Sequence, residues 1–530
     1  MKNKISIIIA PIIFAIVLVI GIYLGKLMNR QADTPFVVYP KVDKLHAVIN
    51  YIKQEYVDTV NVDQLIEMAI PKVLAQLDPH SVYIPASEME ELNEPIEGNF
   101  DGIGVMFNIQ NDTVMVINTI PGGPSEKVGV KAGDRIVYVD DSLFAGIKIS
   151  NKQVMKSLKG PSGTEVKIQV KRKGFDELLD FVIKRDKIPL KSVDIAYMID
   201  DKVTYVKISK FAMNTYGEFE EIINKYKKQG AKSWIIDLRG NGGGIMQAAV
   251  QIADEFLDQG NLIVYTKGRS RKREDILATT KGLCKTDNVV ILMDEWSASA
   301  SEILAGALQD NDRCNIVGRR SFGKGLVQEP TFFPDGSGLR LTIARYYTPT
   351  GRCIQKSYGE NLSDYYMDIS NRYLHGEFSE QDSIHFADSL KFETPKGKIV
   401  YGGGGIMPDY FVPVDTLGYS DFFRQIVARG LIYKFSFNYS DQNREQLEKF
   451  NNYVELNRYL KSQNITHAFI ESLDKKDVNY NQHDFDLSKD RIENRLLSYI
   501  NRNILDDEGF YPTLLLQDLT VKKALEILSK

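Results

Sequence analysis

The chain has 530 residues, of which 43% are hydrophobic and 26% are charged, so it should fold as several globular domains rather than around one core. Its formal net charge is −4, from 66 basic and 70 acidic residues, which gives no reason to expect nucleic acid as a partner. Cys284, Cys314 and Cys353 form no CxxC pair and the six histidines show no HExxH spacing, so neither a disulfide framework, a metal site nor a cofactor is expected.

The first segment of the chain is apolar. Ile5 to Leu24 is an uncharged stretch of 20 residues flanked by lysines. At ~1.5 Å per residue a helix of this length spans roughly 30 Å, the thickness of the hydrocarbon core of a bilayer. The stretch has no small-x-small cleavage site, so we expect residues 1–28 to be an uncleaved membrane anchor. Lys2 and Lys4 predict a cytoplasmic N-terminus, with the rest of the chain across the membrane.

Residues 29–97 form a predicted helical region. Apolar residues recur at helical spacing in "KVDKLHAVINYIKQEYV", at Val42, Leu45 and Ile49. The segment "LDPHSVYIP" then interrupts this pattern with two prolines.

Residues 98–188 are β-rich, with alternating runs in "DTVMVINTI" and "TEVKIQVKRK". The segments "FDGIGVMF" and "GVKAGDRIVYVDD" resemble the carboxylate-binding loop and the middle strands of a PDZ domain. Glycines let such a loop turn its N–H groups toward one point, where a peptide's terminal carboxylate binds while the peptide adds a strand to the sheet. The resemblance implies that Gly102, Ile103, Gly104 and Val105 bind the peptide, and that "SNKQVMKSL" is the helix lining the groove.

Residues 189–418 repeat one pattern, in which a strand leads through a loop into a helix. "SWIIDLRGNGGG" starts with a predicted strand at 234–238, and "NVVILMDEWSASASEILAGALQD" starts with one at 289–293. Such units indicate parallel strands with helical crossovers, whose ligands gather at the carboxyl ends of the strands. The glycine loop and the serine loop should therefore face the same crevice. A phosphate-binding role for the glycine loop is disfavoured, because Ile245 replaces the last glycine of GxGxxG.

The serine loop offers three alternating candidates for a nucleophile, Ser297, Ser299 and Ser301. Ser299 and Glu302 also fit a capping box, which would give the serine a purely structural role. In "RSFGKGLVQ", Lys324 stands between two glycines that leave no neighbouring side chain to solvate its amine. A lysine can act as the base for a serine if burial lowers its pKa by ~3 units, which costs about 4 kcal/mol.

Residues 419–530 form a predicted helical extension. "RIENRLLSYINRNIL" and "TVKKALEILSK" each place apolar residues on one helix face. No catalytic constellation occurs there, so packing, dimerisation and the handling of a substrate or an adaptor protein remain open roles.

Five ordered segments carry a wider resemblance. "DLRGNGGG", "SASASEILAGALQD", "GRRSFGKGLVQ", "LTIARYYTPTGRCIQ" and "GGGGIMPDY" resemble the carboxy-terminal processing peptidases, or tail-specific proteases. With "LDPHSVYIP" and the PDZ-like block, the resemblance spans about residues 40–415. It implies a serine endopeptidase with a Ser/Lys dyad and no catalytic histidine. On this resemblance Ser299 is the nucleophile, Lys324 the base, and Gln328 the residue that orients the lysine.

The resemblance also sets expectations for the rest of the site. The oxyanion of the tetrahedral intermediate needs N–H donors, and the candidates are Ala300, at the start of the serine helix, and either Gly242 or Gly243. Expected substrates are proteins with accessible, apolar C-termini. The catalytic part is expected on the periplasmic side of a bacterial inner membrane.

The predicted architecture is multidomain α/β, with a membrane anchor, a helical segment, a small β-rich PDZ domain, a protease core with parallel strands and a helical extension. Two other functions are open at this point. One is a non-catalytic PDZ scaffold at the membrane, which would not need Ser299, Lys324 and Gln328 together. The other is an acyl-CoA-handling enzyme, which would need neither an anchor nor a peptide-binding module.

Overall fold

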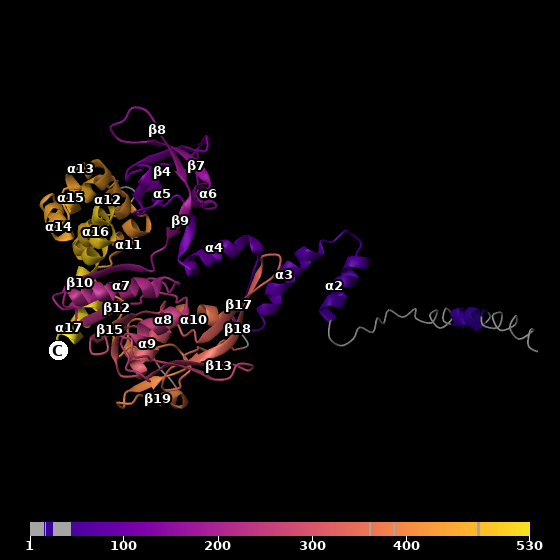
Figure 1. The fold of residues 1–530 in the computed structure, drawn as a ribbon. Helices are drawn as coiled ribbons and strands as arrows, with labels where there is room; N and C mark the ends of the chain where they lie inside the picture. Colours follow the sequence, from indigo (N-terminus) through magenta and orange to yellow (C-terminus); the bar gives the residue numbers. More distant parts are fainter. Residues whose placement is uncertain (1–14, 16, 25–43, 360–361, 385–386, 474–477) are drawn as a thin grey trace, which may run out of the picture. The chain divides into compact units, whose positions relative to one another are not determined.

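The computed structural model describes residues 15, 17–24 and 44–530, apart from 360–361, 385–386 and 474–477 (Figure 1). The chain divides into two compact units, Met1–Val73 and Leu74–Lys530. Most of the predicted anchor lies outside the described residues. Among the residues that are described, no helix combines the length and the apolar character needed to cross a membrane.

From residue 44 on, where the structure describes it, the predicted helical region contains three helices and one short strand. These elements are α2 (Lys44–Glu55), α3 (Val62–Leu74), β1 (Val82–Ile84) and α4 (Ala86–Glu97). The strand coincides with the proline-bounded segment that interrupts the helical pattern, since Pro79 and Pro85 flank it.

The predicted PDZ module folds as an antiparallel sheet in the order β3-β4-β5-β7-β8, with β6 beside β5. The elements are β2 (Asn99–Gly102), β3 (Val105–Gln110), β4 (Thr113–Thr119), α5 (Pro124–Lys127), β5 (Arg135–Val139), β6 (Ser142–Leu143), α6 (Asn151–Leu158), β7 (Glu165–Lys171), β8 (Leu179–Lys184) and β9 (Asp186–Pro189). Strand β3 lies at the edge of this sheet, and β2 pairs with β9. Helix α6 confirms that "SNKQVMKSL" is helical, and Ser150 is its N-cap.

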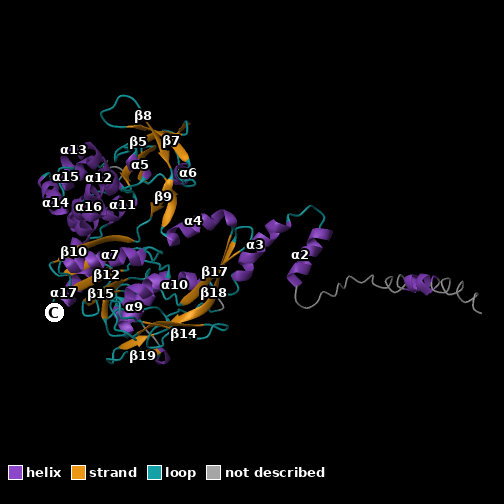
Figure 2. Cartoon of the chain, viewed as in Figure 1, coloured by secondary structure: helices purple, strands orange, loops and turns teal. Residues whose placement is uncertain are grey.

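The core of residues 189–418 is built on a six-stranded sheet in the order β10-β11-β12-β15-β16-β21 (Figure 2). The strands are β10 (Val193–Asp200), β11 (Val203–Ile208), β12 (Ser233–Asp237), β15 (Asn288–Met293), β16 (Cys314–Gly318) and β21 (Tyr410–Phe411). All neighbours pair in parallel except β10 and β11. Parallel pairing brings the carboxyl ends of β12 and β15 to one edge of the sheet, as the strand-loop-helix pattern predicts.

Helices α7 (Thr215–Lys228), α8 (Met246–Asp254) and α9 (Ala300–Asp310) pack on one face of this sheet. On β12, Trp234 and Ile236 point into that core, whereas Ile235 points into the core on the opposite face. Strands that are buried on both faces read as continuous apolar runs, which explains the sequence "SWIID".

The opposite face is covered by the end of the chain. Leu515, Val521 and Ala524 pack there against alternate residues of the central strands, such as Ile235 and Val290. The helical prediction for this extension is confirmed by α11 (Asp421–Ala428), α12 (Leu431–Gln442), α13 (Arg444–Leu447), α14 (Tyr453–Ser462), α15 (Ile465–Ser472), α16 (Gln482–Leu514) and α17 (Leu519–Leu528). The last helix of the extension therefore packs as part of the core around the six-stranded sheet.

A second sheet carries part of the site, in the order β1-β18-β13-β14 with β17 beside β18. Its other strands are β13 (Leu262–Lys267), β14 (Glu274–Leu277), β17 (Leu326–Phe332) and β18 (Gly338–Tyr347). Helix α10 (Leu362–Leu374) and the hairpin of β19 (Lys391–Glu393) and β20 (Ile399–Tyr401) follow in the chain.

Candidate active site

The serine turn lies between β15 and α9. Ser299 is the N-cap of α9, with a φ of 56° and a ψ of −111°. A positive φ is uncommon for a residue other than glycine, and such strain clusters at active sites. The hydroxyls of Ser297 and Ser301 donate to the carbonyls of Leu238 and Asn241, at 2.9 Å each, and both serines are fully buried. Ser299 is partly exposed, so a substrate can reach it.

Lys324 lies in the loop between β16 and β17. Its amine donates to Oε1 of Gln328 at 3.1 Å. Burial lowers the pKa of Lys324 below its usual value and the nearby Arg340 lowers it further, against two carboxylates that oppose the shift. A Cβ at the neighbouring Gly325 would lie 2.9 Å from the backbone nitrogen of Gln355, so the close approach of the two backbones depends on this glycine. The sequence-predicted pair of Lys324 and Gln328 is thus in contact.

Gln328 is held on its other side by the segment "LDPHS". Its Nε2 donates to the carbonyl of His80, 248 positions away in the chain. The Asp78 carboxylate fixes this turn by accepting the N–H groups of His80 and Ser81 at 2.8 Å each. Nε2 of His80 bonds to the Tyr365 hydroxyl at 2.6 Å, and burial lowers the pKa of His80 to about 4, so this ring is neutral. The sequence signals a break at this segment but not its contact with the glutamine.

Glu302 joins the serine turn to the lysine loop. One carboxylate oxygen accepts the N–H groups of Ser299 at 2.8 Å and Lys324 at 2.9 Å. The other accepts the Gly323 N–H at 2.8 Å and the Ser321 hydroxyl. Burial raises the pKa of Glu302 to about 7, although these four donors favour the ionised form. The predicted contact with the serine backbone is confirmed, but the sequence did not predict the contacts with the lysine loop.

Tyr346 makes a second link between the two loops. Its hydroxyl lies 3.1 Å from the Ser299 carbonyl and also donates to the Lys324 carbonyl. No hydrogen bond joins the lysine amine to the serine hydroxyl among the described residues. Catalytic hydrogen bonds are often long until a substrate binds. The structure thus holds the serine and the lysine on neighbouring loops through Glu302 and Tyr346.

The glycine loop packs directly against the serine turn. A Cβ on Gly243 would lie 2.7 Å from the Ala298 carbonyl oxygen and from the Ser299 Cβ. The Gly243 N–H donates to Oδ1 of Asn241 at 2.8 Å. Gly242 is exposed, and no described residue accepts its N–H. Of the two glycines predicted as oxyanion donors, Gly242 is therefore the one with an available N–H.

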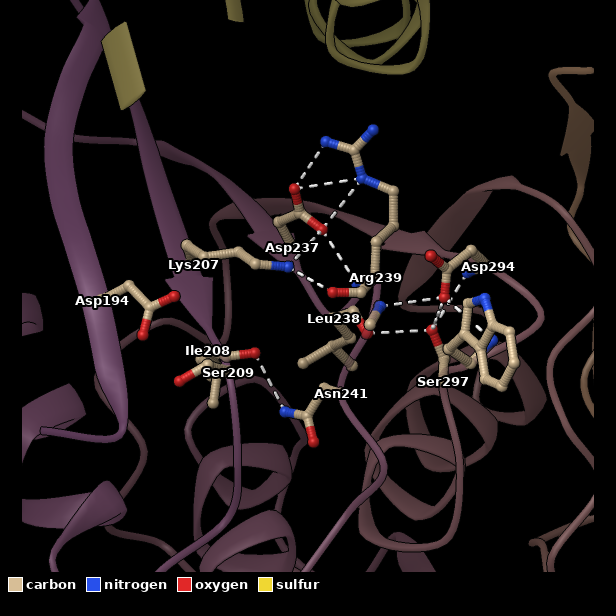
Figure 3. A network of polar contacts seen from close by, with 12 residues as sticks. Asp194, Lys207, Ile208, Ser209, Asp237, Leu238, Arg239, Asn241, Asp294 and Ser297 are labelled. Carbon is tan, nitrogen blue, oxygen red and sulfur yellow. Dashed lines mark hydrogen bonds and ion pairs between the residues drawn. The ribbon is translucent and has the colours of Figure 1, made fainter. Parts of the chain in front are cut away.

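Charged residues fix the start of the glycine loop, as Figure 3 shows. The Asp237 carboxylate, at the end of β12, accepts the Arg239 N–H at 2.9 Å and the guanidinium at 2.6 to 3.1 Å. The Lys207 amine donates to Asp237 at 3.4 Å and to the Arg239 carbonyl. Asp294 accepts the Gly240 N–H at 2.9 Å. Burial alone would raise the pKa of Asp237, but Arg239 and Lys207 lower it below its usual value, so the carboxylate is ionised.

The predicted peptide-binding residues lie between β2 and the edge strand β3. Gly102 ends β2, Val105 begins β3, and Gly104 has a φ of 72°. Both the N–H and the hydroxyl of Ser125 donate to the Ile103 carbonyl, at 3.1 and 2.7 Å. Within the described part of the chain, no acceptor binds the N–H of Ile103 or Gly104. Two N–H groups without an acceptor therefore lie next to the edge strand β3, in residues that are themselves buried.

In the described part of the chain, no group of His, Cys, Asp and Glu side chains could hold a metal ion. Cys284 and Cys314 are free thiols, and burial raises the pKa of both, so they behave as buried hydrophobic residues.

Three family models match the chain. Residues 202–361 match peptidase family S41, residues 102–183 match the PDZ domain, and residues 422–506 match a family of unknown function. The first two matches fall on the module and the core that carry the two glycine loops.

Curated relatives match the chain over more than half of its length. The chain is 34% identical over 334 residues to the carboxy-terminal-processing protease of Bartonella bacilliformis, covering 62% of this chain and 74% of the relative. It is 32% identical over 347 residues to the carboxy-terminal processing protease CtpA of Bacillus subtilis, covering 64% and 73%. Among solved structures, the photosystem II D1 C-terminal processing protease has 27% identity and a TM-score of 0.36, covering 69% of this chain and 87% of that one.

Proposed function

Because the chain belongs to the carboxy-terminal processing proteases of peptidase family S41, we propose that it cleaves peptide bonds with Ser299 as nucleophile and Lys324 as general base. The main support is the Glu302 carboxylate, which accepts the backbone N–H groups of both residues. It therefore holds the two loops at a fixed separation. The strained backbone of Ser299 supports the proposal, since nucleophilic serines sit on sharp strand-to-helix turns in other hydrolases.

In the proposed reaction the neutral amine of Lys324 takes the proton of the Ser299 hydroxyl while the oxygen attacks the scissile carbonyl. Burial supports the neutral amine by lowering its pKa, and Gln328 orients it through the 3.1 Å contact. The oxyanion accepts hydrogen bonds from the N–H groups of Gly242 and Ala300. The ammonium then gives its proton to the leaving amine, and water hydrolyses the acyl-enzyme by the same steps.

We further propose that the PDZ module binds the C-terminus of the substrate protein. The available N–H groups of Ile103 and Gly104 suit a terminal carboxylate, and the edge strand β3 can pair with the residues before it. Met106 on β3 and Met155 on α6 are exposed, which supports a preference for apolar tails.

The test of the dyad is cleavage of an unfolded protein with an apolar tail by the parent and by Ser299→Ala, Lys324→Ala and Ser301→Ala. We expect the first two variants to lose at least about 10³-fold in kcat, as other serine hydrolases do without a catalytic residue. Equal cleavage by Ser299→Ala, Lys324→Ala and the parent would contradict the dyad. Loss in Ser301→Ala but not in Ser299→Ala would contradict only the choice of serine.

Tail recognition has a separate test. The same substrate with an amidated C-terminus lacks the carboxylate, so its KM should rise while its kcat stays constant. An unchanged KM would contradict capture through the PDZ loop and leave the dyad intact.

A membrane anchor at Ile5 to Leu24, with the catalytic part outside the cytoplasm, remains a proposal that its uncharged apolar sequence supports. Extraction of cell membranes with alkaline carbonate tests the anchor, because an integral anchor stays in the pellet. Digestion of the catalytic part by a protease added to spheroplasts tests the side of the membrane.

A further inference from the structure

Asp518 connects the C-terminal extension to the glycine loop of the active site. It is the N-cap of α17, and one carboxylate oxygen accepts the Val521 N–H at 2.9 Å. The other oxygen accepts the Arg239 guanidinium at 2.8 Å, although 279 residues separate the two positions. The side chains are 20% and 19% exposed, so the pair is largely shielded from water.

The charges of this cluster balance only when Asp518 is included. Arg239 and Lys207 are two cations beside the single carboxylate of Asp237, and Asp518 supplies the second carboxylate. A largely buried charge without a partner is costly, so loss of Asp518 should let the Arg239 guanidinium move toward water.

Movement of Arg239 would be transmitted to the glycine loop. Gly240, the residue after Arg239, donates its N–H to the Asp294 carboxylate. The carbonyl of Asn241 accepts the Ala298 N–H at 3.0 Å. The same carbonyl accepts the Ser301 hydroxyl. Gly242 follows Asn241 directly in the chain, so the position of its N–H depends on how the start of the loop is anchored.

We propose that Asp518 is a positioning residue for peptide-bond cleavage. Helix α17 would then contribute to the catalytic centre by holding this carboxylate in place. The proposal rests on the proposed function, because it takes Gly242 as an oxyanion donor. Asp518 lies beyond the residues that the three family models match, so this contact is contributed by the extension. Packing of Val521 and Ala524 against the central sheet keeps α17, and with it the carboxylate, in a fixed place.

The test uses the full-length protein and Asp518→Asn. Asparagine keeps the size of the side chain and its ability to cap a helix, but it removes the charge. Loss of one oxyanion donor costs about 10²- to 10³-fold in kcat. Because the donor here is displaced and not removed, we expect kcat to fall roughly tenfold, with KM close to the parent and a lower Tm from the unpaired charge.

A peptide aldehyde provides a second readout, because the oxygen of its adduct with the nucleophilic serine occupies the oxyanion site. Its affinity should fall by the same factor as kcat. Binding of the uncleaved peptide substrate, measured in a Ser299→Ala background with and without Asp518→Asn, should stay unchanged.

The matched control is Asn452→Ala. Asn452 caps α14 in the same extension by accepting the Glu455 N–H at 2.9 Å, but it makes no contact with the glycine loop. The control should match the parent in kcat. The proposal is overturned if Asp518→Asn keeps the parental kcat, or if both variants lose kcat and Tm in parallel.

A double-mutant cycle tests the route. If Asp518 acts through Arg239, then adding Asp518→Asn to Arg239→Gln should lower kcat no further. Additive losses would overturn that route. A parent enzyme that cleaves no protein would overturn the proposed function, and this inference with it.

Discussion

The chain contains two glycine loops that present backbone N–H groups, and they are held in different ways. In the PDZ loop, neutral contacts from Ser125 and Ile120 fix the carbonyls of Ile103 and Gly104. In the proposed catalytic loop, charged side chains fix the start of the loop, namely Lys207, Asp237, Arg239, Asp294 and Asp518.

This difference matches the two proposed tasks. A peptide carboxylate is already charged before it binds, so the peptide and the loop can adjust to each other during binding. An oxyanion forms only during the reaction, and N–H donors stabilise it best when they are already in place. The comparison predicts that small changes in the catalytic loop lower kcat, whereas similar changes in the PDZ loop raise KM.

The largest effect is expected from Gly243→Ala. The new Cβ would lie 2.7 Å from the Ser299 Cβ, and the backbone has a φ of 98°. Displacing the nucleophile and the neighbouring donor should lower kcat by about 10²- to 10³-fold. The control is Gly230→Ala, which has a φ of 97° but no atom within 4 Å of the new Cβ. A similar loss of kcat in both variants would show that backbone strain alone, and not contact with Ser299, is responsible.

Glu302→Gln should have the next largest effect. An amide NH2 would face backbone N–H groups, and a buried donor left without an acceptor costs ~1–3 kcal/mol. We therefore expect kcat to fall roughly 10- to 100-fold, with tail binding unchanged. Glu255→Gln is the control, because Glu255 is also buried and accepts the Tyr216 hydroxyl and the Leu283 N–H, away from both loops. A parental kcat in Glu302→Gln would show that the carboxylate does not position the dyad.

The sequence could predict the residues whose neighbours in the chain define their role. Ser299, Lys324 and Gln328 lie in short motifs, and the order of strand, loop and helix already places the serine at the carboxyl end of β15. The strand at 289–293 follows from its apolar run, and the structure extends it by one residue to Asn288, whereas the helix α6 is expected from the PDZ resemblance.

Other parts of the site depend on contacts between distant segments, which periodicity does not encode. The sequence predicts that Glu302 caps the serine helix. It does not predict the contacts of Glu302 with Gly323 and Lys324, because these form only when the lysine loop folds back. The bond from Gln328 to His80 and the pair of Arg239 and Asp518 join residues 248 and 279 positions apart.

The pH dependence of kcat should differ from the pH dependence of peptide binding. Lys324 has a lowered pKa and must be neutral to act as a base, whereas Glu302 has a pKa raised to about 7 and must be ionised to accept its four donors. Both groups bind a proton and lose their working form as pH falls. Protonation of Glu302 should therefore make kcat decline below about pH 7 by up to tenfold per pH unit, and protonation of Lys324 adds to the decline.

Peptide capture should not follow that decline. The PDZ loop uses backbone N–H groups, which do not titrate, and a terminal carboxylate has a pKa of about 3.3 to 3.7. Binding of a fluorescent apolar peptide to Ser299→Ala should therefore be constant between pH 8 and pH 6. Parallel loss of binding and kcat would contradict the separation.

The smallest effect is expected from Gly104→Ala. Its φ of 72° disfavours a side chain, and the new Cβ would lie 3.1 Å from Cδ1 of Ile188, a flexible end that can move. The Ile103 and Gly104 N–H groups should shift slightly, so KM for an apolar tail should rise about 3- to 10-fold at constant kcat. Gly122→Ala is the control in the same module, because it has the same φ of 72° but no atom within 4 Å. If Gly104→Ala lowers kcat and leaves KM unchanged, the PDZ loop takes part in the chemical step, and the division of labour between the two loops is wrong.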